Sequence, residues 1–143
     1  MNLKKSTLEK IHITCVNDIV KKFSRSIGVI YDRKLAKNNI TVSQFSILSH
    51  IFYYENIALG KLADHLKMDR TTLTKNLKPL FRERYIEIID TDDKRIKSLK
   101  LTKIGINKLE GSVKLWKEAQ ETIYSKYGKK NIHQLVSLLH NLM

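Results

Sequence analysis

Apolar residues recur every three or four positions from about Ser6 to Lys37, and this spacing predicts one long amphipathic helix. A helix of this length runs for about eight turns, which is more than a small globular domain usually needs. We therefore expect it to reach beyond its own domain to a partner. Its apolar stripe consists of Val16, Ile19, Val20, Phe23, Ile27, Ile30, Tyr31 and Leu35.

Shorter helices follow in the middle of the chain. Asn38-Asn39 can end the first helix, because Asn tolerates the left-handed conformation found at helix ends. Thr41 or Ser43 can cap the next helix, and Glu55-Asn56 interrupts it.

A tight pair of helices comes next. A short helix is predicted from about Leu59 to Leu66, and a connection through Lys67-Met68 leads to Asp69, a good N-cap. The helix after this cap runs to about Arg84 and carries polar and basic side chains. This arrangement is typical of a helix-turn-helix, although an ordinary helical hairpin is the commoner alternative.

The hydrophobic period then changes from 3.6 to about 2, which indicates strands. Tyr85–Ile89 and Ile96–Leu101 are the two predicted strands, and the polar segment Asp90–Arg95 is the loop between them. A helix-turn-helix followed at once by a charged hairpin is a winged helix, with the hairpin as its wing.

Two more helices are predicted after the hairpin. Thr102 caps the first, Gly128 ends it, and Asn131 caps the last. The predicted fold is mainly α with a small β-hairpin, in one domain over residues 1–143. A winged helix-turn-helix module at about 41–102 is inserted between N- and C-terminal dimerisation helices at about 1–37 and 103–143. These ends carry more apolar surface than the module can cover, which favours a homodimer.

Composition narrows the class of partner. The formal net charge is +13, which favours nucleic acid or an acidic membrane surface. Cys15 is the only cysteine, so an intrachain disulfide is impossible and a reducing compartment is indicated. The first ten residues lack a signal-peptide core, and no apolar run approaches the ~20 residues of a membrane span. We therefore expect a cytoplasmic protein without a membrane partner.

The motifs, taken in order, resemble the multiple antibiotic resistance regulator (MarR) family. Met68–Leu80 is similar to the recognition helix of one branch of that family. Asp93-Lys94-Arg95, followed by Leu101–Gly105, resembles the family's wing signature, and Tyr31-Asp32 and Gln44-Phe45 also fit. Arg84 stands where the family usually has Gly in a left-handed position. The resemblance covers nearly the whole chain and implies a regulator of transcription.

The resemblance also implies which side chains meet DNA. Exposed residues in the first turns of a recognition helix face base edges, and Arg70, Thr72 and Lys75 are the candidate base readers. At the wing, Arg95 suits a narrow minor groove, and Asp93 can pair with it and aim it. The full predicted DNA-binding set is Arg70, Thr71, Thr72, Thr74, Lys75, Lys78, Lys94, Arg95 and Lys97.

Family members commonly release DNA when they sense a phenolic compound, an oxidant or a metal. Cys15, predicted to lie in the first helix, is a candidate redox sensor, but nearby Asp18 disfavours the reactive thiolate and a plain buried cysteine is favoured. The histidines lack metal-ligand spacing, so neither a metal nor a cofactor is expected. The aromatic candidates for an effector cleft are Tyr31, Phe52, Tyr53 and Trp116, which are more simply core residues.

We therefore predict a sequence-specific, double-stranded DNA-binding regulator that reads an inverted-repeat operator. It would be a repressor released by a small-molecule or oxidant signal. The alternative is a non-specific architectural DNA- or RNA-binding protein, and a protein-interaction module that merely retains the winged fold is a further rival. The sequence contains no Gly-rich phosphate loop, nucleophile elbow or paired-carboxylate signature, which argues against an enzyme.

Overall fold

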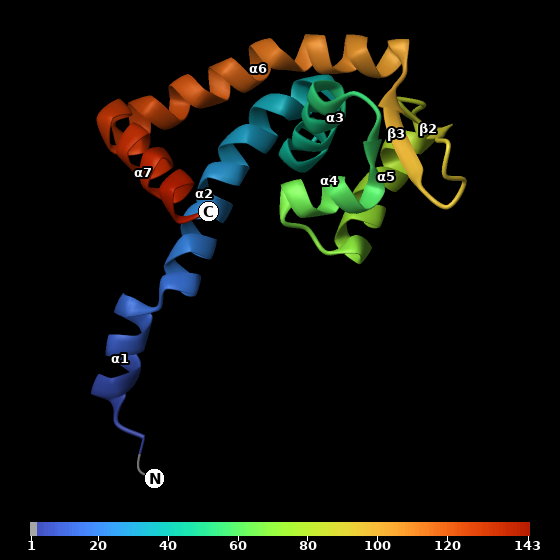
Figure 1. Cartoon of the computed structure of the whole chain (residues 1–143). Coiled ribbons are helices and arrows are strands. Elements are labelled where there is room, and N and C mark those ends of the chain that lie inside the picture. The colour runs from blue at the N-terminus through green and yellow to red at the C-terminus, as the bar shows by residue number, and fades with distance from the viewer. Residues whose placement is uncertain (1–2) are drawn as a thin grey trace.

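A 25-residue helix, α6 (Lys103–Tyr127), runs along one side of the molecule and joins the winged end to the terminal helices (Figure 1). The computed structural model describes residues 3–143, so the first two residues of the predicted domain lie outside it. The other helices are α1 (Lys5–Thr14), α2 (Val16–Leu35), the 3-10 turn η1 (Ala36–Asn38), α3 (Val42–Tyr54), α4 (Leu59–Leu66), α5 (Arg70–Arg82) and α7 (Lys129–Leu142).

The winged helix is confirmed, with one more strand than predicted. Strands β1 (Ile57–Ala58), β2 (Ile86–Asp90) and β3 (Lys97–Leu101) form an antiparallel sheet in the order β1-β3-β2. In this sheet Leu99 of β3 pairs with both Ile57 and Ile88. The sequence did not predict β1 because two residues are too short to show a period of two.

The predicted first helix is wrong in one respect, since it breaks at Cys15. Cys15 has ψ 103°, an extended value, and separates α1 from α2. The apolar residues keep their helical spacing across Cys15, so the hydrophobic pattern did not indicate a break. The break lies where β-branched residues cluster, at Ile11, Ile13, Thr14 and Val16, and β-branching lowers helix propensity.

Most of the predicted caps are confirmed. Thr41, rather than Ser43, caps α3 in a capping box with Gln44. Thr102 accepts a hydrogen bond from the backbone N of Gly105 at 3.0 Å and caps α6. The predicted cap at Asn131 is wrong: α7 begins two residues earlier, at Lys129, after the left-handed turn at Gly128.

Arg84 has the left-handed conformation that its place in the motif predicts, with φ 57°. Tyr85, which follows it, donates a backbone hydrogen bond to the carbonyl oxygen of Leu80 at 2.9 Å and so closes the end of α5. A non-Gly residue at such a position costs about 1 kcal/mol.

One apolar core lies beneath the winged module and the adjoining parts of α2 and α6. Its centre contains side chains that are at most 1% exposed, from α2, α3, α4 and α5: Leu35, Ile47, Leu48, Ile51, Leu62, Leu73 and Leu80. Since α5 contributes to this core along one face, its opposite face is left at the surface.

Candidate nucleic-acid interface

The exposed face of α5 carries every helix residue predicted to meet DNA. Leu73, Leu77 and Leu80 point into the core, which turns the polar side chains outward. The exposed set is Arg70, Thr71, Thr72, Thr74, Lys75 and Lys78. A ligand that approaches this face of α5 therefore meets the threonine side chains of its first two turns and the positive charges of Arg70, Lys75 and Lys78.

Local hydrogen bonds order this first turn. Asp69 accepts from the backbone N of Thr72 at 2.8 Å and from its hydroxyl at 2.6 Å. These bonds, the hydroxyl one first, lower the pKa of Asp69 from its ordinary value. Thr74 donates its hydroxyl hydrogen to the carbonyl oxygen of Arg70 at 2.7 Å. Both hydroxyl hydrogens are thus used within the helix, and the methyl groups and oxygen lone pairs remain available for a partner.

The wing carries a paired arginine at its tip. Asp93 Oδ1 accepts hydrogen bonds from the backbone N of Arg95 at 3.0 Å and from its Nε at 3.2 Å. These bonds lower the pKa of Asp93. The predicted pair is therefore confirmed, and it forms in the turn that precedes β3, which begins at Lys97.

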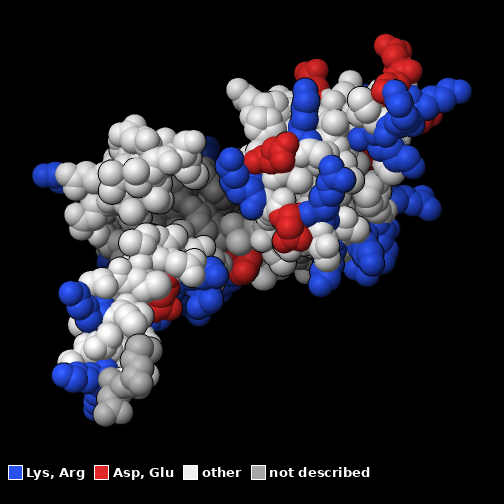
Figure 2. All heavy atoms as spheres, turned by 60° about the horizontal axis from the view of Figure 1, so that its bottom comes forward, with Lys and Arg blue, Asp and Glu red and all other residues white. Residues whose placement is uncertain are grey.

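The arginine nevertheless stays open to a partner. The side chain of Arg95 is 90% exposed although Asp93 orients it. Lys94 and Lys97 are also exposed beside it. Figure 2 shows Lys and Arg side chains outnumbering acidic ones over the winged end of the molecule. The helix face and the wing together form a basic surface, which suits a polyanion.

The terminal helices leave a second, apolar surface open. A cavity of about 660 Å³ lies between α2, α6 and α7, and its walls include Phe23, Ile27 and Ile132. Val16, at the start of α2, is 74% exposed. Other exposed apolar side chains on α1, α2 and α7 are Leu8, Ile11, Ile13, Ile19, Val20, Val29, Val136, Leu138, Leu139 and Leu142. Exposed apolar surface on this scale marks an interaction site.

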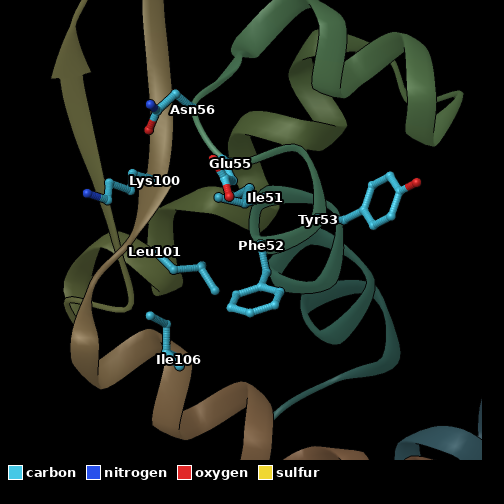
Figure 3. Close-up of a pocket in the computed structure, with 8 residues that line it drawn as sticks. All are labelled: Ile51, Phe52, Tyr53, Glu55, Asn56, Lys100, Leu101 and Ile106. Carbon is cyan, nitrogen blue, oxygen red and sulfur yellow. The ribbon is translucent and has the colours of Figure 1, made fainter.

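The four aromatic candidates for an effector cleft do not come together. Phe52 and Tyr53 border a cavity of about 550 Å³ between the end of α3 and the start of α6. Tyr31 instead lines the cavity among the terminal helices, and Trp116 stacks on Phe45 against the core. In Figure 3, Phe52 extends toward Leu101 and Ile106, while Tyr53 points away. Lys100 also points away from that apolar wall, while Glu55 and Asn56 complete the lining of the cavity.

Cys15 is half-buried and lies at the break between α1 and α2, not within a helix as predicted. Asp18, one turn away, binds Lys22 at 2.6 Å. This contact lowers the pKa of Asp18.

Sequence reasoning missed one polar cluster between distant segments. Asn38 of η1 contacts Lys108 and Ser112 of α6, and Lys108 lies over the ring of Tyr85. Of its members, the sequence indicated only Asn38, as a helix end, and Tyr85, as the start of a strand, and it did not relate the two. A contact across 70 residues leaves no periodic signal.

Two other features bear on the kind of site. Within residues 3–143, no three His, Cys, Asp or Glu side chains are grouped so that they could hold a metal ion. Over the same residues, every helix is too short or too polar to cross a membrane.

The three-stranded sheet, the exposed α5 and the hairpin beside it define a winged helix-turn-helix protein with long helices at both ends. Residues 40–97 match the model of the MarR family. The winged part of the chain is therefore similar to the MarR family. No curated protein matches the sequence.

Solved structures share the fold over nearly the whole chain. The M. tuberculosis transcriptional regulator MosR in complex with DNA is 28% identical, with a TM-score of 0.76 over 90% of this chain and 95% of that one. A mutant of E. coli MarR complexed with operator DNA is 21% identical, with a TM-score of 0.82 over 93% and 96%. The S. aureus MepR–DNA complex is 22% identical, with a TM-score of 0.74 over 89% and 95%. The terminal helices are thus part of the same fold.

Proposed function

We propose that this protein is a transcriptional regulator that binds double-stranded DNA at specific sequences, and not an enzyme. The observation that carries the proposal is the pairing of an exposed, capped α5 with an oriented Arg95 at the wing beside it. The MosR structure, which contains DNA and shares the fold at 28% identity, supports it. We also propose that the protein is cytoplasmic, since a regulator works in the compartment that holds its DNA.

The proposed contacts divide by chemistry. Arg70 and Lys75 can donate to guanine O6 and N7 in the major groove, and the methyl of Thr72 can meet a thymine methyl. Thr71 and Thr74 lie on the same face. Arg95 enters the minor groove, where a narrow A·T-rich segment strengthens the negative potential. Lys78, Lys94 and Lys97 bind phosphates, which adds affinity without sequence preference.

The active form is a homodimer joined through its terminal helices. The exposed apolar side chains of α1, α2 and α7, together with the cavity among α2, α6 and α7, give a second copy a surface to bury. A two-fold dimer presents two copies of α5 to one face of DNA. It therefore requires an inverted repeat with half-sites about 34–36 Å apart, one helical turn.

Repression is the mode of regulation that we propose, since it is usual in the MarR family. A small molecule or an oxidant would release the DNA. A small molecule can act at the cavity beside Phe52. Cys15 is the candidate site for an oxidant, although its half-buried position favours a plain structural cysteine.

Selection of bound sequences from a random duplex pool tests the proposal. We expect the selected DNA to converge on an inverted repeat. A pool that stays random despite tight binding would favour the architectural alternative. A pool that is never retained, even at low salt, would contradict DNA binding altogether.

A further inference from the structure

A polar cluster joins the end of α2 to the middle of α6, and we call it the Asn38 junction: Asn38, Lys108, Ser112 and Tyr85. Asn38 Nδ2 donates hydrogen bonds to Ser112 Oγ at 2.8 Å and to the carbonyl oxygen of Lys108 at 3.2 Å. Lys108 Nζ in return donates to the carbonyl oxygen of Asn38 at 3.0 Å. The two segments therefore hold each other by bonds in both directions.

Burial makes this geometry specific. Ser112 is 0% exposed, and its hydroxyl hydrogen is already donated to the carbonyl oxygen of Lys108. Its oxygen depends on Asn38 for a donor, and a buried group left without its partner is costly. Gly111 leaves room for the amide, since a Cβ there would lie 3.3 Å from Asn38 Nδ2. A shift of α2 along α6 would break these bonds together.

The same cluster reaches the end of the recognition helix. Lys108 Nζ lies 5.2 Å from the centre of the Tyr85 ring, and Tyr85 directly follows the left-handed Arg84 at the end of α5. The carbonyl oxygen of Tyr85 accepts from the backbone N of Thr102 at 3.0 Å. A Cβ on Gly105 would lie 1.9 Å from that oxygen, so α6 packs there without spare room. The end of α5, the first turns of α6 and the end of α2 are thus connected in series.

We propose that Asn38 and Lys108 are positioning residues that set the separation and tilt of the two recognition helices in the dimer. The inference rests on the proposed function. α2 leads to the apolar surface that joins the two copies, and α5 carries the DNA-reading face. The Asn38 junction is where these two parts meet. A small rotation there moves the start of α5 relative to the α5 of the second copy. Every DNA-reading side chain keeps its position on its own helix.

The test uses the full-length protein and a set of duplexes with the selected half-sites. Their spacing varies one base pair at a time, up to half a helical turn. Lys108→Met and Asn38→Ala remove the junction. Lys114→Met removes an exposed lysine from the same helix and is the matched control for charge. Lys108→Arg keeps a cation that can reach Asn38 and Tyr85. Melting temperatures verify that each variant is folded.

The wild type should lose about 100-fold in affinity between the best spacing and half a turn away, since a rigid dimer then engages only one half-site. Lys108→Met and Asn38→Ala should lose less than about tenfold over the same range, because a loose dimer adapts. Lys114→Met and Lys108→Arg should keep the wild-type profile. Spin labels on α5, introduced by Thr71→Cys in a Cys15→Ser background, should show a broader distance distribution between the copies in Lys108→Met.

Each result decides the question. A wild-type profile retained by Lys108→Met and Asn38→Ala, with unbroadened distances, would overturn the positioning role while leaving DNA binding intact. If Lys108→Met weakened binding by the same factor at every spacing, Lys108 would contribute only its charge, and this result would also overturn the positioning role. A wild type that binds every spacing and every scrambled duplex alike would instead contradict the proposed function, and the inference with it.

Discussion

The carboxylate of Asp93 binds Arg95 through both its backbone N and its side-chain Nε, so the wing arginine is oriented before any partner arrives. Thr91 closes the loop around this pair, since its hydroxyl lies 2.8 Å from the carbonyl oxygen of Asp93 and 2.9 Å from that of Ile96. Orientation in advance lowers the entropy cost of binding, because fewer side-chain rotamers must be fixed afterwards.

Two substitutions of Arg95 distinguish the contribution of its charge to DNA affinity from that of its planar guanidinium group. Arg95→Ala should weaken operator binding and reduce the slope of log K against log salt by about one charge equivalent. Arg95→Lys keeps the charge but loses the planar donor fork, so its slope should match the wild type while its preference for A·T-rich flanks falls. Fluorescence anisotropy at several salt concentrations measures both effects. An unchanged slope for Arg95→Ala would refute the wing contact.

The cap of the recognition helix should make stability depend on pH. Hydrogen bonds from Thr72 lower the pKa of Asp69, so its stabilising contribution is present at neutral pH and is lost as pH falls below about 4, through the lowered pKa of the folded state. Asp69→Ala should therefore unfold at lower urea than the wild type at pH 7, by a gap that narrows at pH 3. Asp69→Asn keeps a capping oxygen without titrating. An Asp69→Ala gap of equal size at both pH values would contradict this role.

Gly105 should not tolerate a side chain. A Cβ there would lie 1.9 Å from the carbonyl oxygen of Tyr85. Gly105→Ala must therefore push the start of α6 away from the segment that follows α5. We expect a loss of about 3 kcal/mol or more in the free energy of unfolding. Gly60→Ala is the control: its Cβ would meet only Arg70 Nη2, at 4.0 Å. It should be neutral or stabilising by up to about 1 kcal/mol. Urea unfolding of both variants tests the contrast, and equal stabilities would refute it.

Cys15 should not be needed for a response to peroxide. It is half-buried at the break between α1 and α2, which limits its access to an oxidant. Wild type and Cys15→Ser should therefore have the same operator affinity with and without peroxide. Loss of DNA by the treated wild type alone would show that Cys15 is a redox sensor.

The sequence predicted those features that have a local cause. The caps at Thr41, Asp69 and Thr102 follow from side chains that bond their own first turn. The left-handed Arg84 follows from its place in a motif. Opposed local preferences hid the break at Cys15, where apolar spacing favours a helix and β-branching opposes it. The Asn38 junction depends on a contact between segments that only the completed fold brings together.

The DNA-reading residues are predicted from the motif and exposed in the structure, and their contact with bases stays a prediction. The relation between α5 and the terminal helices had no local signal, since it depends on the Asn38 junction and on the fit of Gly105 to Tyr85. The sequence therefore predicts which residues lie on the exposed face of α5, but it does not predict how α5 is placed relative to the terminal helices.

The most direct test of the account is the affinity of the wild-type protein for its selected inverted repeat, compared with a scrambled duplex of the same length and composition at one salt concentration. The account predicts that the repeat is bound at least about 1,000-fold more tightly, as two protein copies per duplex. Equal affinities for the two duplexes, or one copy bound per repeat, would contradict it.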